Sequence, residues 1–324
     1  MKNISFIKRI SLLLFIALGF FATAAMAQDY PSRSVRMVVP FPPGSATDLA
    51  ARTVGQQLGS ALGQPFVIDN KPGAGGSIAA MEVIRSPADG YTLLFSSNSA
   101  ISSNVALYKK IPYDPNKDFS PIASIGSTLL VLMVKNDFPA KNMQEFIVNL
   151  KQRPGKVSAG YGSSSSQVSI AILNKLAGLD ALAIPYKGIP QAVNDVMTGV
   201  LDFTFVDIGN AIAQAKGGMM RPLGVTSLNR NVMVPEWPAM SEALPGFDIT
   251  AWFAIVGPAG MPKAVVDKLS LATNQAIKLP DVKEKLATVG IAPVPMQPEQ
   301  LKTYISTEIV KWTQIVKDAK IAPQ

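Results

Sequence analysis

Short apolar runs alternate with segments whose apolar residues recur at helical spacing along most of this chain. The pattern predicts strands at residues 35–39, 66–69, 91–96, 129–134, 157–159, 183–186, 203–206, 223–226 and 250–256. It predicts helices that begin at Ser45 and near Ser166 and Pro190, and further helices over residues 77–85, 143–152, 263–277, 281–289 and 298–318. Such alternation favours an α/β fold with mainly parallel sheets and helices on both faces.

The loop after the first predicted strand holds the most informative motif, PFPPGSATD (residues 40–48). Pro42 and Pro43 end the strand because proline has no backbone N–H for a sheet ladder. Ser45 and Asp48 match the S-x-x-D capping pattern, which satisfies free N–H groups of a first helical turn. A helix N-terminus reached through a glycine loop also offers an anion its donors and a positive dipole end. A well-capped first helix without a ligand is the competing interpretation.

A similar arrangement recurs in the middle of the chain. The strand near Val157 runs into GYGSSSS (residues 160–166), which precedes a helix, and YKG (186–188) precedes another. The serine run is compatible with a flexible linker, but its place between a strand and a helix favours a capping or anion-binding loop. Several helix N-termini are therefore expected at strand ends, where open α/β sheets place their ligands.

Three charged residues near these loops have two interpretations each. Asp48 either caps its helix only or also contacts a ligand, and Lys187 either balances a bound anion or is a solvated loop lysine. Asp207 follows an apolar strand and is either a cap for the next turn or an acceptor in a pocket. Trp252 and Phe253 are expected in the core rather than in a pocket.

The N-terminal segment has the pattern of a signal peptide. A basic start is followed by an apolar run over residues 10–21 and by Ala25-Met26-Ala27, so cleavage is expected after Ala27 and export to a periplasm follows. A membrane anchor is disfavoured because the run is shorter than the roughly 20 residues that a span needs. No later stretch is long and apolar enough to span a membrane.

Composition excludes several classes of function. The chain has neither cysteine nor histidine, which removes disulfides, thiol chemistry, Ser-His-Asp triads and His- or Cys-ligated metals. The loop GAGGSI (residues 73–78) lacks the third glycine of a dinucleotide fingerprint, so it is interpreted as a turn that approaches a ligand. No cofactor and no metal are expected. Basic residues are scattered, and the net charge of +8 falls to +5 without Lys2, Lys8 and Arg9, so no nucleic-acid partner is expected.

Eight segments in order resemble one known family. They are PFPPGSATDLAAR (40–52), NKPGAGGSIAA (70–80), DGYTLL (89–94), YKKIPYDPNKDFSPI (108–122), PYKG (185–188), FTFVD (203–207), RPLGVTS (221–227) and WFAIVGPAGMP (252–262). The chain is similar to the tripartite tricarboxylate transporter receptors, the Bug family of periplasmic solute-binding proteins. The resemblance extends over essentially the whole chain after the signal peptide.

The resemblance implies a type II periplasmic-binding-protein fold, with two Rossmann-like lobes, a hinge and a ligand cleft between them. Lobe 1 would hold residues 28–126 and 252–324, and lobe 2 residues 127–251. The implied function is that of a monomeric receptor, not an enzyme, which captures a small organic carboxylate for the membrane subunits of a tripartite tricarboxylate transporter. Family ligands include di- and tricarboxylates, acidic amino acids and aromatic acids.

Two other functions stay open beside this one. An orphan receptor would bind a carboxylate in the same way but feed a signalling partner. An exported enzyme using Asp48, Lys187 or Asp207 is disfavoured by the absence of histidine, cysteine and a cofactor motif.

Matching the family pattern residue by residue implies a set of ligand-binding positions. In lobe 1 these are Phe41, Gly44, Ser45, Ala46, Asp48, Ser97 and Asn98; in lobe 2 they are Ser163, Ser164, Ser165, Gln167, Lys187 and Asp207. The chain departs from the pattern at three places. Ile101 and Gln167 stand where many members carry histidine, and Ser45 replaces the second glycine of the first loop. These departures concern which carboxylate binds, and the sequence does not identify it.

Overall fold

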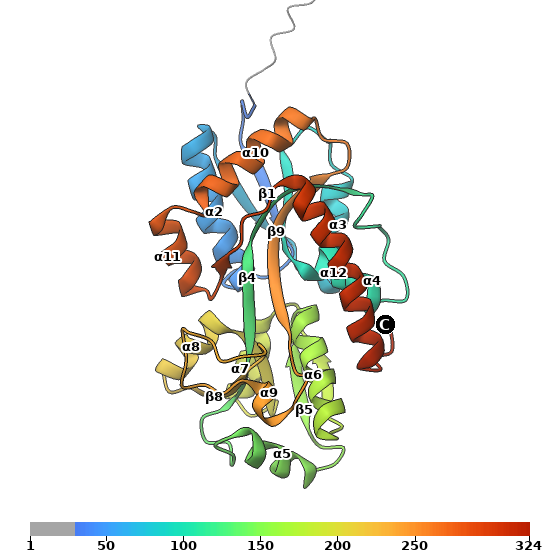
Figure 1. The fold of residues 1–324 in the computed structure, drawn as a ribbon, viewed down its shortest axis with the longest axis vertical. Helices are drawn as coiled ribbons and strands as arrows, with labels where there is room; N and C mark the ends of the chain where they lie inside the picture. Colours follow the sequence, from blue (N-terminus) through green and yellow to red (C-terminus); the bar gives the residue numbers. More distant parts are fainter. Residues whose placement is uncertain (1–29) are drawn as a thin grey trace, which may run out of the picture. The chain divides into compact units, whose positions relative to one another are not determined.

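Ten strands form one mixed sheet, through which the long strands β4 (Phe119–Lys135) and β9 (Thr250–Pro258) pass side by side (Figure 1). The computed structural model describes residues 30–324, of which residues 33–324 form one compact unit. The predicted signal peptide lies outside the described residues. Among residues 30–324, no helix is long and apolar enough to cross a membrane.

The strands pair in two groups that meet along β4. The first strand group has the order β2-β1-β3-β9-β4, with β10 also paired to β4, and uses β4 up to Leu129. Its other members are β1 (Val35–Val39), β2 (Phe66–Asn70), β3 (Thr92–Ser97) and β10 (Ala292–Pro293). The second strand group has the order β4-β7-β5-β6, with β8 also paired to β4, and uses β4 from Leu130. It contains β5 (Ser158–Tyr161), β6 (Leu182–Pro185), β7 (Phe203–Asp207) and β8 (Met220–Val225).

The prediction of mainly parallel sheets holds for the outer strands and is wrong for the centre. Strand β1 is parallel to β2 and β3, and β5 is parallel to β6 and β7. Strands β4 and β9 are antiparallel to each other and to their other partners. Because these two strands carry the chain from one group to the other and back, they run in opposite directions.

Strand β4 is continuous over 17 residues, whereas the sequence predicts a strand only from Leu129. Its first half contains Ser, Gly and Pro, which weaken a strand pattern, and the pairing with β9 shifts register near Pro121 and near Ser124. Such bulges accommodate a proline that has no N–H to donate. Pairing with β9 and β10 on both edges keeps this stretch extended despite its composition.

Most of the helices lie where the periodic pattern predicts them, with two corrections near the loops. Helix α6 begins at Ser164, two residues before the predicted start, because Ser163 is its N-cap. After β3, where the pattern predicts no helix, the chain forms a π-helical segment, η2 (Ser99–Ser103), and then α4 (Asn104–Leu107). The other elements are α2 (Ala46–Leu62), η1 (Ala74–Gly76), α3 (Ser77–Ile84), α5 (Met143–Lys151), α7 (Ile189–Met197), α8 (Ile208–Lys216), α9 (Met240–Ala243), α10 (Lys263–Ala276), α11 (Pro280–Thr288) and α12 (Pro298–Asp318).

Side chains of β4 alternate between two hydrophobic cores in the second strand group. Leu130, Leu132 and Val134 pack with residues of α5 and α6, whereas Val131 and Met133 pack with residues of α7 and α8 on the other face. This follows from the two-residue period of a strand. A third core lies beneath α3 and α12 in the first strand group and contains the buried Trp252, as predicted. Figure 1 shows α5 to α9 around one end of β4 and β9, and α2, α3, α10, α11 and α12 around the other.

Candidate functional site

Two cavities that share lining residues lie where helix N-termini meet. The large cavity has a volume of about 410 Å³ and the small cavity about 30 Å³; both are lined by Phe41, Gly162 and Ser163. Of the sequence-predicted site residues, the small cavity is also lined by Ser45, Ala46, Ser97, Ser165 and Asp207. The large cavity is also lined by Ser164, Gln167 and Lys187. Gly44, Asp48 and Asn98 line neither of the two.

The N-terminus of α2 presents free backbone donors to the small cavity. Ser45 caps the helix, and its Oγ accepts from the Asp48 N–H at 3.3 Å. The next two N–H groups, of Ala46 and Thr47, make no hydrogen bond to a described residue, as expected for a first helical turn. Both residues line the small cavity. Gly44 has φ of 82°, a left-handed conformation that favours glycine at this turn.

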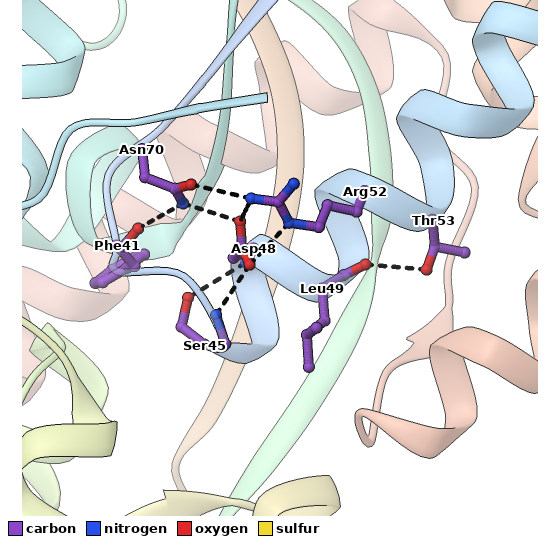
Figure 2. A network of polar contacts seen from close by, with 8 residues as sticks. Phe41, Ser45, Asp48, Leu49, Arg52, Thr53 and Asn70 are labelled. Atoms are coloured by element: carbon purple, nitrogen blue, oxygen red, sulfur yellow. Dashed lines mark hydrogen bonds and ion pairs between the residues drawn. The ribbon is translucent and has the colours of Figure 1, made fainter. Parts of the chain in front are cut away.

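Asp48 holds the loop before α2 in place through hydrogen bonds (Figure 2). Its Oδ2 accepts from the Gly44 N–H at 2.9 Å and from Arg52 Nε at 3.1 Å, and its Oδ1 accepts from Asn70 Nδ2 at 2.9 Å. Asn70 also donates to the Phe41 carbonyl at 2.9 Å. The carboxylate is thus engaged by the protein itself. Its place in the structure is that of a capping and loop-positioning group.

Replacing Asp48 by alanine is expected to destabilise the protein by about 2–4 kcal/mol, because the Gly44 N–H and the Asn70 amide lose hydrogen bonds to a buried, charged acceptor. Urea unfolding of the purified variant measures this loss. Arg52→Ala is the matched control: the Arg52 side chain is half exposed, so its removal is expected to cost less than about 1 kcal/mol. Equal losses in the two variants would contradict the role given to the buried carboxylate.

The N-terminus of α6 repeats the arrangement of α2. Ser163 caps the helix, and its Oγ accepts from the Ser166 N–H at 3.2 Å, while Ser166 Oγ accepts from the Ser163 N–H at 3.1 Å. The Ser165 N–H makes no hydrogen bond to a described residue, and Ser165 lines the small cavity. Two capped helices therefore direct free N–H groups and positive dipole ends at one small space.

Three loops approach one another too closely for larger side chains. A Cβ added to Gly162 would lie 2.2 Å from the carbonyl carbon of Gly188, and a Cβ added to Gly188 would lie 2.5 Å from Cδ of Pro42. Glycine at these two positions lets the loops that precede α2, α6 and α7 pack together around the cavities.

Hydroxyl groups join the two strand groups beside the small cavity. Ser164 Oγ, at the start of α6, lies 2.8 Å from Ser99 Oγ and 2.6 Å from Ser103 Oγ, both in η2. Ser165 Oγ donates to Oδ1 of Asn98 at 3.3 Å. Asn98 and Ser164 thus connect the segment after β3 with the N-terminus of α6.

Asp207 brings a carboxylate to this otherwise positive environment. It is the N-cap residue of α8, but its side chain makes no capping hydrogen bond, and it has no ion pair with a residue of the described part. It lines the small cavity, where burial raises its pKa to about 6. Of the two predicted roles, the geometry agrees with an acceptor in the cavity.

The large cavity has a partly aromatic wall. Tyr108, Tyr161 and Tyr186 line it, together with the glycine loop of residues 73–76. Partial burial and a hydrogen bond to Asp195 raise the pKa of Tyr186 to about 12, and burial raises the pKa of Tyr108, so both phenols are neutral donors near pH 7. Lys187 adds a cation that makes no ion pair with a carboxylate of residues 30–324.

A comparison with protein families identifies the family of the chain. Residues 50–321 match the tripartite tricarboxylate transporter family receptor. The chain belongs to this receptor family. Solved structures of similar proteins include Rpa4515 of R. palustris with adipate, at 31% identity and a TM-score of 0.88 over 91% of this chain and 100% of that one.

Two other solved structures extend the comparison. The periplasmic binding protein BugD is 31% identical to the receptor, with a TM-score of 0.87 over 91% of this chain and 100% of its own. MatC of Rhodopseudomonas palustris with bound malate is 31% identical, with a TM-score of 0.82 over 89% and 100% of the two chains. These likenesses confirm the predicted periplasmic-binding-protein fold.

Sequence reasoning missed several residues that line the receptor's cavities. Tyr161 lies inside the GYGSSSS segment and Tyr186 beside Lys187, so the loop motifs held a signal for both. Tyr108 begins the family segment at residues 108–122, but nothing in that segment marks it as a cavity residue, and Gln324 lies in no motif. Phe253 is buried as predicted but also lines the small cavity.

Proposed function

We propose that this receptor captures a small organic carboxylate whose headgroup lies in the small cavity. The observation that supports this most is the pair of helix N-termini whose free N–H groups, of Ala46, Thr47 and Ser165, belong to residues lining that space. Backbone donors at two helix ends favour an anion without a countercharge. The hydroxyls of Ser45 and Ser163 add further donors.

The rest of the ligand would extend into the large cavity. Its tyrosines suit an apolar or aromatic body, and Lys187 suits a second carboxylate. Rpa4515 with adipate and MatC with malate are related proteins whose ligands carry two carboxylates. The candidate ligands are therefore dicarboxylates and tricarboxylates, acidic amino acids and aromatic acids.

We infer further that the two strand groups move as lobes. Residues 28–126 and 252–324 would form one lobe and residues 127–251 the other, joined along β4 and β9. A ligand that bonds to the N-termini of both α2 and α6 favours the closed arrangement, because it contacts both lobes only there. The serine contacts between η2 and α6 agree with such a closed arrangement.

The family of the receptor and the signal-peptide pattern of its N-terminal segment support a proposal for its place in the cell. We propose cleavage of a signal peptide after Ala27, a monomeric receptor in the periplasm, and transfer of the ligand to the membrane subunits of a tripartite tricarboxylate transporter. Capture without chemical change is supported by the absence of histidine and cysteine from the sequence and by the engagement of Asp48 in its loop.

Thermal melting of residues 28–324 with malate, adipate, citrate, glutamate and benzoate tests this proposal. A ligand at 100 times its Kd adds about 2.7 kcal/mol of stability, so at least one acid should raise the melting temperature by about 4 °C. Dimethyl adipate is the matched control, since it has the chain of adipate without its charges. An equal shift with the ester, or no shift with any acid at 10 mM, would overturn the proposal.

A further inference from the structure

The C-terminal helix α12 is anchored on the first strand group. Leu301 and Ile305 are buried in the core beneath β9. Further along the helix, the buried Glu308 accepts hydrogen bonds at Oε2 from Trp252 Nε1 of β9 at 2.8 Å and from Trp312 Nε1 at 3.0 Å. Two indole N–H groups on one buried carboxylate fix the helix against β9.

The end of the same helix packs against the second strand group. Trp312 and Val316 are buried in the core that contains Val168 and Leu173 of α6. Lys175 Nζ of α6 donates to the Asp318 carbonyl at 2.6 Å. Helix α12 therefore contacts both groups, and Figure 1 shows its end near α4 and α6.

Residues 321–324 then continue to the large cavity. Lys320, with φ of 52°, turns the chain after α12, and Ile321 packs against the core around α6. The Gln324 N–H donates to the Leu107 carbonyl at 2.9 Å, and the Lys109 N–H donates to the main-chain oxygen of Gln324 at 2.8 Å. These two bonds are made on either side of Tyr108, a residue of the cavity wall.

The side chain of Gln324 contacts the opposite side of the cavity. Its Nε2 donates to the phenolic oxygen of Tyr161 at 2.8 Å, and both residues line the large cavity. Tyr161 ends β5 of the second strand group, whereas the Leu107–Lys109 segment begins at the last residue of α4. One residue thus bonds through its backbone to one side of the cavity and through its side chain to the other.

We propose that residues 321–324 form a clasp over the ligand cavity and that Gln324 helps to select the ligand. The inference rests on the proposed function, because the large cavity is where the body of the acid would lie. The Gln324 amide has a second N–H and an Oε1 that bond to no residue of the described part. Being neutral, it offers a donor to a ligand carboxylate and an acceptor to a ligand hydroxyl or amino group.

Ligand-free protein provides the first test, which does not depend on knowing the ligand. The chain has no cysteine, so spin labels are attached only at Gln56→Cys on α2 and Asn194→Cys on α7, both exposed positions. Pulsed electron–electron double resonance then measures the distribution of distances between the two labels. Gln324→Ala and Tyr161→Phe each remove the side-chain bond and keep the backbone bonds, so both are expected to shift the distribution toward longer distances.

The matched control is Gln314→Ala, since Gln314 Nε2 bonds to Asp318 Oδ1 within α12 and Gln314 lines neither the large nor the small cavity. It should leave the distribution unchanged. Identical distributions in wild type, Gln324→Ala and Tyr161→Phe would overturn the clasp, whether or not any acid binds.

Calorimetric titration with the acids that stabilise the wild type provides the second test. Loss of one hydrogen bond predicts about three- to tenfold weaker binding for Gln324→Ala and for Tyr161→Phe. The double variant should be no weaker than either single one, because both remove the same bond. Additive losses, or no loss, would contradict a direct Gln324–Tyr161 contact in the bound state.

Gln324→Glu separates ligand selection from a merely structural role. The Tyr161 hydroxyl can donate to the new carboxylate, so the clasp is kept, but a negative charge then faces the ligand. We expect weaker binding than in Gln324→Ala for malate and adipate, with a loss that shrinks as salt is added. Wild-type affinity in this variant would show that Gln324 does not face the ligand. If no acid binds the wild type, the proposed function fails, and the distance measurement alone decides the clasp.

Discussion

Replacing Ser45 or Ser163 by aspartate is expected to weaken the binding of a carboxylate ligand by about 30- to 1000-fold while the protein stays folded. Both serines are N-cap residues, and both line the small cavity. Two negative charges about 4 Å apart repel by about 4 kcal/mol at the effective dielectric constant near a protein surface. Aspartate is itself a strong N-cap residue, so each helix keeps a capping acceptor.

Asparagine at the same positions is the matched control. Ser45→Asn and Ser163→Asn have nearly the same size and capping ability as the aspartate variants but add no charge. Any loss of affinity in the asparagine variants should come from side-chain size alone and be only a few-fold. These variants should therefore bind the ligand far more tightly than the aspartate variants. Calorimetry with the strongest acid of the thermal screen measures the affinities, and melting confirms the fold. Equal affinities for Asp and Asn variants at both positions would place the anion elsewhere.

Much of the fold could be predicted because most elements have a clear periodic pattern. Strand β1 and helix α12 begin and end at the predicted residues, and α2 begins after the predicted cap. The first half of β4 could not be predicted, because its extended form depends on pairing with β9 and β10 rather than on its own composition. For the same reason the antiparallel centre of the sheet was not visible in local patterns.

In the candidate site, likewise, local features could be predicted and contacts between distant segments could not. Ser45 was predicted as a cap because a cap is a local feature, readable from residues three apart, whereas the serine run indicated a capping or anion-binding loop without singling out Ser163. Asp48 stayed ambiguous in the sequence, since Asn70 reaches it only through the pairing of β1 with β2. Gln324 and Tyr108 were missed because their meeting depends on how α12 packs across the molecule.

Asp207 makes the stability of the ligand-free receptor depend on pH. Its pKa of about 6 lies above the ordinary value of 3.8 because burial disfavours the charged form. The folded protein therefore holds this proton more tightly than the unfolded chain. The stability that this bound proton contributes is fully present below about pH 4 and is lost as the pH rises through about 6. The upper limit of this loss is about 3 kcal/mol.

Asp207→Asn should accordingly be more stable than the wild type at pH 7.5, by up to about 3 kcal/mol, with a difference that disappears near pH 4. The neutral amide has the shape of the carboxyl group without the cost of burying a charge. Urea unfolding of both ligand-free proteins at the two pH values measures this difference. A constant difference at both pH values would contradict the titration of Asp207.

The same variant identifies what Asp207 bonds to in the complex. A carboxylate beside a bound acid repels it unless a donor lies between them, so an amino or hydroxyl group of the ligand is the expected partner. Loss of a hydrogen bond to a charged group is worth about 1.5–3 kcal/mol, which predicts about 10- to 100-fold weaker binding of glutamate or malate to Asp207→Asn. Adipate has no such donor and should bind the variant at least as tightly as the wild type. Equal changes for both kinds of acid would indicate a bridging water in place of a ligand donor. If Asp207→Ala changed neither affinity nor melting, Asp207 would be a solvated strand end and would leave the candidate site.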